Sequence, residues 1–502
     1  MQRICVLGLC AALAVLSGVP LGAKAADTPY LARFEERVTE FTLDNGLQFL
    51  VIERDNAPVA SFVTVVDVGS AYEPTGKTGM AHLIEHLAFK GTPRIGTTDW
   101  EQEQQALQRL DQAYQDWQDY KATQNPDPER LQKKRKRFEK WQKRAGEYVQ
   151  ANAFAKILEK NGGTDLNAAT SADLTQYYCS LPANRAELWF SLEADRLQNP
   201  VWREFYTEKQ VILEERRMRV DTNPNGKLLE RLLATSYISH PYGQPVIGWR
   251  SDIEQLNKAD LEAFYSTYYV PQNMTIAVAG DVQPEQIKTW AKQYFGHMPA
   301  GPKPPKLTLQ EPPQEGRRLV EISSPNRPVL AQSFHTVPQG HADFLALELL
   351  GDILAKGRTS RLYTELVEKQ QLAAHIFAFN GYPGVQYTPL FMVFAIPNAD
   401  TPLAKVEEGI AEVITTVREQ GVTQEELQRA KAKMRAGVIR GLDSNLGLAK
   451  SFAEAEVLRG QWQRVFTRLS ALEQVGVEKI QAVAQDYLQL ETSTTGKLEY
   501  EN

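Results

Sequence analysis

The stretch "GMAHLIEHLAFKGT" (Gly79–Thr92) places two histidines and a glutamate within five residues. On a helix, residues four apart share a face, so His82 and His86 project together with Glu85 beside them. Two imidazoles at this spacing can bind zinc, and the adjoining carboxylate can serve as general base toward water that the metal activates. The order His-x-x-Glu-His reverses the familiar zinc motif and is the inverzincin arrangement. The alternative is a polar helix face on which these residues meet by chance.

A catalytic zinc site needs a third protein ligand, and a downstream segment supplies candidates. The segment "REFYTEKQVILEERRMRVD" (Arg203–Asp221) is helix-like, with Glu208 and Glu215 seven residues apart, two turns along one face. Glu204 lies one turn before Glu208, and Glu214 is the immediate neighbour of Glu215. Spacing alone leaves all four glutamates open as ligands, and each also fits a solvated helix surface.

The 502-residue chain is long enough for two or three domains. Its composition is that of a globular protein, 42% hydrophobic and 24% charged, and a net charge of −6 gives no reason to expect nucleic acid as a partner. Of its three cysteines, Cys5 and Cys10 lie in a removable N-terminal segment, which leaves Cys179 alone. A single cysteine forms neither an internal disulfide nor a thiolate zinc site, so histidines and carboxylates must hold any metal.

Residues 1–25 have the features of a cleavable secretory signal. One arginine precedes an apolar run from Ile4 to about Leu21, and a small-x-small exit follows at Ala23–Ala25. A membrane anchor is the alternative, but glycine and proline interrupt the run. No later segment approaches ~20 continuous apolar residues, so we expect no membrane span in the mature chain. These features predict an exported protein, either periplasmic or secreted.

A proline-rich strap, "MPAGPKPPKLTLQEPPQEG" (Met298–Gly316), divides the chain. It predicts a zinc-bearing domain at 26–298, a linker at 299–316 and a second domain at 317–502. Each half opens on two strand-like runs before a helix: "LQFLVIERD" and "VASFVTVVDVGS" in the first, "RRLVEISS" and "PVLAQSFHTVP" in the second. The parallel predicts an α+β fold of two homologous domains, each an antiparallel or mixed sheet with packed helices.

One segment, at about 100–154, breaks this symmetry. It is dense in charged residues and glutamine, and apolar residues recur at helical spacing on both sides of "NPDP" (Asn125–Pro128). Two amphipathic helices around a proline turn predict an inserted antiparallel helical hairpin. The run "KKRKR" (Lys133–Arg137) fits a nucleic-acid patch or a solvated helix face, and acidic residues on the facing helix favour the solvated face.

Several motifs in a fixed order carry a family resemblance. The motifs "HLIEHLAFKGT", "GGTDLNAATSADLTQYY" (Gly162–Tyr178) and "EKQVILEE" resemble the pitrilysin/insulysin family of zinc peptidases, which includes the mitochondrial processing peptidases and many bacterial relatives. The segments "HPYGQPVIGW" (His240–Trp249) and "YYVPQNMTIAVAGDV" (Tyr268–Val282) extend the resemblance over nearly the whole mature chain.

The resemblance implies a set of roles for the site residues. His82 and His86 would bind one Zn²⁺ per chain, Glu215 would be the third ligand, and Glu208 would assist from close by. Glu85 would be the general base. The distance from His86 to Glu215 exceeds that usual in the family, and the excess matches the helical hairpin.

The resemblance also implies a substrate strand in "DLNAATS". Asn167, Ala168 and Thr170 would lie on an edge strand whose free backbone groups pair with an extended peptide. Such main-chain recognition would accept varied substrate sequences. The alternative for Asn167, Thr170 and Tyr177 is ordinary strand and turn packing.

The second domain departs from the family pattern. Active relatives usually carry there an arginine and, seven residues later, a tyrosine that grip the substrate. In "LVEKQQLAAH" (Leu366–His375), Val367 and Ala374 stand at these places. The gap implies a heterodimer in which a homologous second subunit supplies the pair, or else a homodimer or monomer with a differently built grip.

The sequence therefore predicts a zinc-dependent endopeptidase that hydrolyses peptides or unfolded protein segments as the metal-bearing subunit of a dimer. The second domain would be non-catalytic. Two alternatives stay open: a catalytically silent structural or binding subunit of the same fold, and a zinc amidase that acts on cell-wall peptides.

Overall fold

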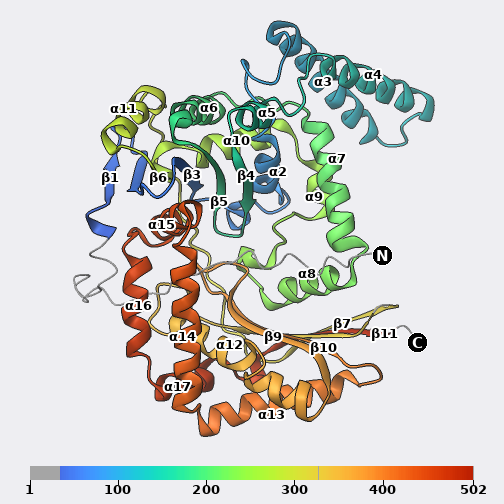
Figure 1. The fold of residues 1–502 in the computed structure, drawn as a ribbon. Coiled ribbons are helices and arrows are strands. Elements are labelled where there is room, and N and C mark those ends of the chain that lie inside the picture. The colour runs from blue at the N-terminus through green and yellow to red at the C-terminus, as the bar shows by residue number, and fades with distance from the viewer. Residues whose placement is uncertain (1–33, 326, 501–502) are drawn as a thin grey trace.

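The computed structural model describes residues 34–325 and 327–500, so the predicted signal peptide at 1–25 lies outside the described residues. Two β-sheets organise this part of the chain (Figure 1). The strand order is β1-β2-β6-β3-β5-β4 in the first sheet and β7-β11-β8-β10-β9 in the second. No helix in the described ranges is long and apolar enough to cross a membrane.

The strands of the first sheet are β1 (Val38–Thr42), β2 (Gln48–Glu53), β3 (Val59–Val66), β4 (Thr164–Thr170), β5 (Thr175–Pro182) and β6 (Met274–Gly280). Those of the second sheet are β7 (Arg318–Ser324), β8 (Val329–His335), β9 (Ala373–Tyr382), β10 (Leu390–Pro397) and β11 (Thr494–Tyr500). Without β1, the two orders correspond strand for strand. The β2/β6 and β7/β11 pairs are parallel and all other pairs are antiparallel, which confirms the predicted α+β fold of two related domains.

Helices pack on these sheets. Those in the first half are α2 (Met80–Leu87), α3 (Trp100–Lys121), α4 (Pro128–Gly146), α5 (Ala153–Lys160), α6 (Ala186–Gln198), α7 (Phe205–Arg216), α8 (Pro224–Ser236), α9 (Arg250–Gln255), α10 (Lys258–Tyr268) and α11 (Pro284–Phe295). Those in the second half are α12 (Phe344–Ala355), α13 (Leu403–Gln420), α14 (Gln424–Gly441), α15 (Asn445–Arg459), α16 (Arg464–Gln474) and α17 (Val477–Tyr487).

The two halves exchange helices across the proline-rich strap. In β2, Phe49 and Val51 face a core shared with α2, α6 and α11, while Leu50 and Ile52 face the opposite side. That opposite side is covered by α15 and α16, which come from the second half. In return, α8 of the first half packs on the second sheet against β7, β8 and β11 (Figure 1). Each sheet therefore depends on the other half for one of its covers.

Helices α3 and α4 form the predicted hairpin, which extends outward from the body of the molecule (Figure 1). Asp99 and Asp127 cap the two helices by accepting backbone N–H groups at their first turns. The hairpin base is tied to the body by Glu103, which is fully buried and pairs with the buried Arg203. In the basic run, Arg137 pairs with Asp116 of α3, as a solvated helix face would.

Candidate metal centre

Helix α2 begins in a way that fixes its histidines. Gly79 precedes it with a φ of 90°, a left-handed conformation that glycine adopts without strain. The buried Glu73 accepts hydrogen bonds from the backbone N–H groups of Gly79 and Ala81, both at 2.7 Å. A carboxylate at a helix N-terminus satisfies free donors and interacts favourably with the helix dipole. Glu73 therefore anchors the start of the helix that carries His82 and His86.

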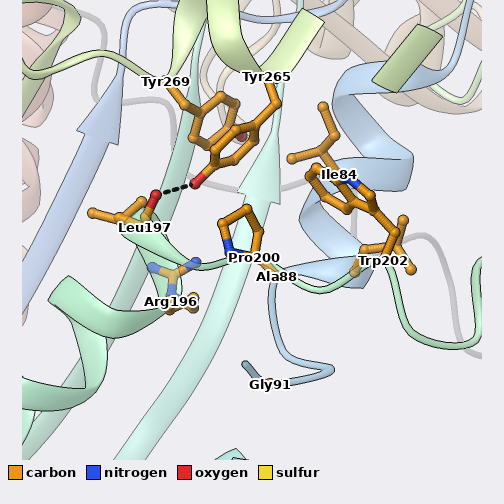
Figure 2. Close-up of a pocket in the computed structure, with 10 residues that line it drawn as sticks. Ile84, Ala88, Gly91, Arg196, Leu197, Pro200, Trp202, Tyr265 and Tyr269 are labelled. Atoms are coloured by element: carbon orange, nitrogen blue, oxygen red, sulfur yellow. Dashed lines mark hydrogen bonds between the residues drawn. The ribbon is translucent and has the colours of Figure 1, made fainter. Parts of the chain in front are cut away.

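The opposite face of α2 packs into the protein interior. Ile84 and Ala88 line a small cavity there together with Trp202, Tyr265 and Arg196 (Figure 2). Its volume of about 10 Å³ is barely enough for one water molecule. This cavity is a packing gap, so the chemistry of α2 lies on its histidine face.

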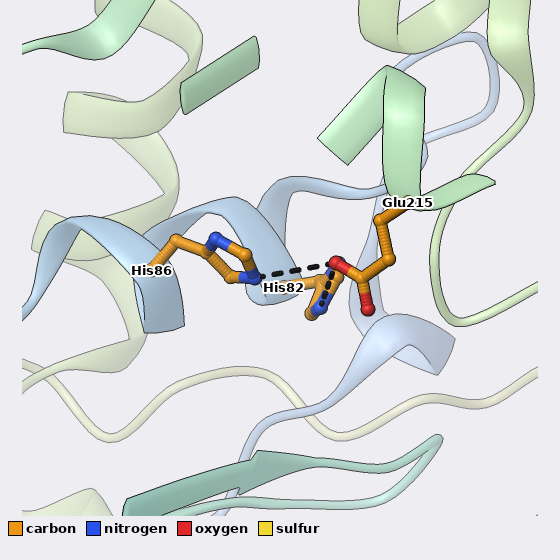
Figure 3. A group of neighbouring side chains, drawn as sticks. All are labelled: His82, His86 and Glu215. Atoms are coloured by element: carbon orange, nitrogen blue, oxygen red, sulfur yellow. Dashed lines mark ion pairs between the residues drawn. The ribbon is translucent and has the colours of Figure 1, made fainter. Parts of the chain in front are cut away.

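Helix α7 brings Glu215 to the two histidines. Glu215 Oε2 lies 3.8 Å from His82 Nε2 and 3.5 Å from His86 Nε2 (Figure 3). One ligand atom from each of the three side chains can be chosen so that all lie within 4.8 Å of one another. Within the described residues, this is the group of metal-binding side chains that the structure brings together.

These distances suit zinc. Tetrahedral zinc holds N and O ligands at about 2.0–2.2 Å, which places ligand atoms roughly 3.3–3.5 Å apart. The observed 3.5 and 3.8 Å are close to this spacing and long for hydrogen bonds. His82 is buried, and the ring nitrogen that it turns toward Glu215 is Nε2. Two imidazole nitrogens and a carboxylate oxygen form a ligand set that zinc commonly takes in proteins.

The two histidines have opposite electrostatic surroundings. Burial lowers the pKa of His82 to about 4, so its imidazole is neutral near pH 7 and has a free lone pair. Burial alone would also lower the pKa of His86, but Glu208 and Glu215 outweigh it and raise that pKa to about 9. The carboxylates thus make the position of His86 favourable for positive charge, from a proton or from a metal ion.

The four glutamates that spacing left open have four different surroundings. Glu208 Oε2 lies 3.2 Å from His86 Nδ1, on the far side of the ring from Glu215. Lys90 Nζ contacts Glu208 at 2.5 Å and Glu204 at 3.0 Å. The exposed Glu214 pairs with Arg217. Glu215 is therefore the one of the four whose carboxylate faces both histidines.

Glu85 lies beside this group and contacts the predicted substrate strand. Its Oε2 accepts a 2.6 Å hydrogen bond from the hydroxyl of Thr170, the last residue of β4. Burial raises the pKa of Glu85, and the Thr170 hydrogen bond opposes that rise. A carboxylate whose pKa is raised toward neutrality suits a general base. Thr170 is thus both part of the predicted substrate strand and the hydrogen-bond donor to Glu85.

Strand β4 is an edge strand, hydrogen-bonded to β5 on one side only among the described strands. Asn167 is exposed, and its side chain accepts a hydrogen bond from the backbone of Ala168. Ala168 pairs with Tyr177 of β5, whose ring is buried and stacks on Arg196 at 4.0 Å. The strand therefore offers a free backbone edge next to the metal-binding group.

Two neighbours of the site were missed by the sequence reasoning. Lys90 holds Glu208, and Arg219 lies 2.8 Å from Glu215 Oε1, the oxygen turned away from the histidines. Arg219 follows Glu215 by four positions, the spacing of helix neighbours, so that pair could have been found in the sequence. Lys90 lies beyond the end of α2 at Leu87 and contacts a residue of another helix, so local spacing did not indicate it.

The positions where the family carries an arginine and a tyrosine lie in the second half. Val367 packs against the core of that half, and Ala374 is half-buried on β9. Neither side chain carries a polar group that could grip a peptide.

Comparisons with known proteins agree with the geometry. The family model described as "Insulinase (Peptidase family M16)" matches residues 49–119 and 143–249 and skips part of the hairpin. The model described as "Peptidase M16 inactive domain" matches residues 255–434. The chain is 30% identical to "Zinc protease PqqE" of Helicobacter pylori, over 97% of both chains.

Two further relatives extend the comparison. A protein of Schizosaccharomyces pombe named "Probable mitochondrial-processing peptidase subunit beta" is 26% identical, over 84% of this chain and 82% of its own. The crystal structure of a protease from Helicobacter pylori has a TM-score of 0.77 at 27% identity, over 92% of this chain and 99% of that one. With family models covering most of its length and a histidine pair facing a glutamate at zinc spacing, this chain belongs to peptidase family M16.

Proposed function

We propose that this chain is a zinc-dependent endopeptidase that cleaves peptides or unfolded protein segments. The observation that carries the proposal is the convergence of His82, His86 and Glu215 at zinc spacing, with Glu85 beside them. In this proposal these three residues hold one Zn²⁺ and Glu208 orients His86 through Nδ1. A zinc ion bound here would polarise the scissile carbonyl and lower the pKa of a water molecule toward neutrality.

Glu85 moves the proton in this proposal. Its Oε2 is held by Thr170, while Oε1 makes no hydrogen bond to the residues that the structure describes. Oε1 accepts a proton from the attacking water, and the carboxylic acid then delivers it to the leaving amine. The raised pKa of Glu85 favours both steps, because a base with a pKa nearer neutrality also becomes a usable acid.

Strand β4 holds the substrate in this proposal. The free edge at Asn167–Thr170 pairs with the main chain of an extended peptide, as in other cases of β-strand addition. Recognition through backbone groups places the scissile bond near Glu85 without requiring a particular side chain. The substrate class is therefore an extended or unfolded segment.

The partner and the cellular location are further parts of the proposal. Val367 and Ala374 supply no substrate grip, which supports a dimer whose homologous second subunit contributes an arginine and a tyrosine. The relative from Schizosaccharomyces pombe is itself named as a subunit. A homodimer is the other arrangement. The signal-like residues 1–25 support an exported protein, periplasmic or secreted.

The test uses the purified mature chain and its Glu85→Gln variant. Elemental analysis measures zinc, and mass spectrometry follows cleavage of an unstructured peptide. We expect one zinc per chain in both proteins and a loss of cleavage of about 10²-fold or more in the variant. Zinc without cleavage by the wild-type chain would point to a missing second subunit. Absence of zinc would instead support a silent structural subunit.

A further inference from the structure

The turn between β4 and β5 is held by the other half of the molecule. Ser171 donates its N–H to the carbonyl of Leu174, and its hydroxyl accepts from the N–H groups of Asp173 and Leu174. This turn directly follows Thr170, which holds Glu85. Whatever fixes the turn therefore also fixes the hydroxyl that positions the carboxylate.

Asp173 is the residue of this turn that reaches across. Its side chain is buried and makes three hydrogen bonds. Oδ2 accepts from the backbone N–H groups of Val385 at 2.5 Å and Gln386 at 3.2 Å. Oδ1 accepts from the hydroxyl of Tyr242, which is also buried. Val385 and Gln386 lie in the loop between β9 and β10 of the second half.

The contact between loop and turn is close and reinforced. A Cβ atom at Gly384 would lie 2.5 Å from the Tyr242 hydroxyl and 2.6 Å from Asp173 Oδ1, so only glycine fits there. Gln386 also donates to Asp67 at 2.8 Å and accepts from the hydroxyl of Tyr72 at 3.0 Å. Val385 and Gln386 thus bond to three separate segments of the first half.

We propose that Asp173 is a positioning residue that ties the β9–β10 loop to the β4–β5 turn and, through Thr170, sets the place of Glu85. The inference rests on the proposed function for the role of Glu85, and it gives the second half a task in the site without any contact to substrate. A half that carries no catalytic group would then still be required for catalysis.

The first experiment is a mutant cycle on the full mature chain. Asp173→Ala and Gly384→Ala, one on each side of the contact, should each lower kcat about tenfold or more, since small misplacements of catalytic groups are that costly. KM should change less than about threefold and zinc content should not change. Asp173→Asn keeps an acceptor for the two backbone N–H groups and should restore most of kcat.

The decisive comparison is with Thr170→Val, which removes the hydroxyl bonded to Glu85. If Asp173 acts through Thr170, the double variant with Asp173→Ala should be no slower than Thr170→Val alone. If the fold-losses in kcat of the two single variants multiply in the double variant, the proposal is overturned. An Asp173→Ala protein with full kcat would also overturn it.

A second measurement does not depend on peptidase activity. Amide hydrogen exchange of the segment 164–182 should accelerate in Gly384→Ala, although the change lies in the other half. The matched control is Asp343→Asn, since Asp343 is a buried carboxylate that bonds to Lys479 and Tyr487 within the second half. This control should leave exchange in 164–182 and kcat unchanged.

Unchanged exchange in Gly384→Ala would overturn the proposal. Equal effects of Asp343→Asn would also overturn it, in favour of general destabilisation. If the wild-type chain binds no zinc and cleaves no peptide, the proposed function fails by that result, while the exchange experiment still decides whether the second half holds this turn.

Discussion

Glu208 and Glu215 lie on the same helix, two turns apart, yet their carboxylates meet different partners. Glu215 faces Nε2 of both histidines, and Glu208 faces Nδ1 of His86 together with Lys90. Hydrogen bonds from His86 and Lys90 outweigh burial and lower the pKa of Glu208. Glu208 is therefore ionised, and it contacts the His86 imidazole at Nδ1, the ring nitrogen that faces away from Glu215.

This difference predicts which of two substitutions weakens zinc binding more. Glu215→Gln should weaken zinc binding by more than about 100-fold, because it removes a ligand, and Glu208→Gln by about 10–100-fold, because it removes only the support of one. Competition with a chelator measures both affinities. The exposed Glu214→Gln, whose carboxylate pairs with Arg217, is the control and should bind zinc normally. The reverse order for Glu208 and Glu215 would overturn the ligand assignment.

His240 should make stability depend on pH. Burial lowers its pKa to about 4 although Glu311 opposes the shift, and its Nδ1 accepts from the backbone N–H of Tyr242, which a protonated ring could not do. Between pH 6.5 and about 4, the unfolded chain binds a proton here that the folded chain does not. The neutral His240 therefore contributes fully to the free energy of unfolding above pH 6.5, and this contribution is lost as pH falls toward 4.

The measurement compares Tm across this range for the wild type and His240→Asn. An asparagine oxygen can still accept from the N–H two residues on, but it does not titrate. The wild type should therefore lose Tm more steeply than the variant between pH 6.5 and 4. Parallel curves would show that His240 does not contribute to the acid loss.

At the scale of elements, the hairpin supports the helix that carries the glutamates. Tyr206 of α7 donates to Asp111 of α3, and Lys209 of α7 donates to Tyr114 of the same helix. Arg203, just before α7, pairs with Glu103 and also donates to the backbone of the loop after α2. The insertion therefore links α2 and α7, the two helices of the candidate metal centre.

This arrangement predicts unequal effects of two charge removals in the hairpin. Glu103→Gln leaves the buried Arg203 uncompensated and should lower the free energy of unfolding by about 3–5 kcal/mol. Asp116→Asn breaks the exposed pair with Arg137 and should cost less than about 1 kcal/mol. Urea unfolding measures both. Equal small effects would mean that the hairpin base is not part of the cooperative fold.

Sequence periodicity was enough to predict the helices of this hairpin, because each amphipathic face repeats locally. It did not predict that Glu103 is buried against Arg203, since these residues are 100 positions apart. In the same way, spacing predicted Glu204, Glu208, Glu214 and Glu215 on one helix but could not choose among them, and Glu204 in fact precedes α7 with a left-handed φ of 58°. The choice depends on how α7 is rotated against α2, which only packing sets.

At the scale of the whole molecule, the halves are mutually dependent. Phe452 of α15 and Phe466 of α16 are fully buried in a core that includes β2, β3 and β6 of the first sheet. Leu228 and Leu232 of α8 are buried in a core that includes β8 and β11 of the second. Cutting the chain at the strap would expose both cores to water.

We therefore expect residues 34–298 expressed alone to aggregate or to bind hydrophobic dyes, because one face of the first sheet loses its cover. Co-expression with residues 299–500 should restore a soluble complex. Gel filtration and dye binding measure the outcome. A monomeric first half that unfolds cooperatively would show that α15 and α16 are dispensable covers.

The sequence by itself determined the local features of this protein: the histidine helix, three glutamates on α7 with Glu204 just before it, the amphipathic hairpin and the repeated strand-strand-helix opening. Each follows from residues within a few turns of one another, where periodicity and spacing carry the information. Tertiary structure alone decided that Glu215 faces both histidines and that α8 and α15 each pack on the sheet of the other half. It also decided that Asp173 hydrogen-bonds to the β9–β10 loop. These contacts join residues up to hundreds of positions apart, so they depend on packing of complete elements, which local sequence patterns do not encode.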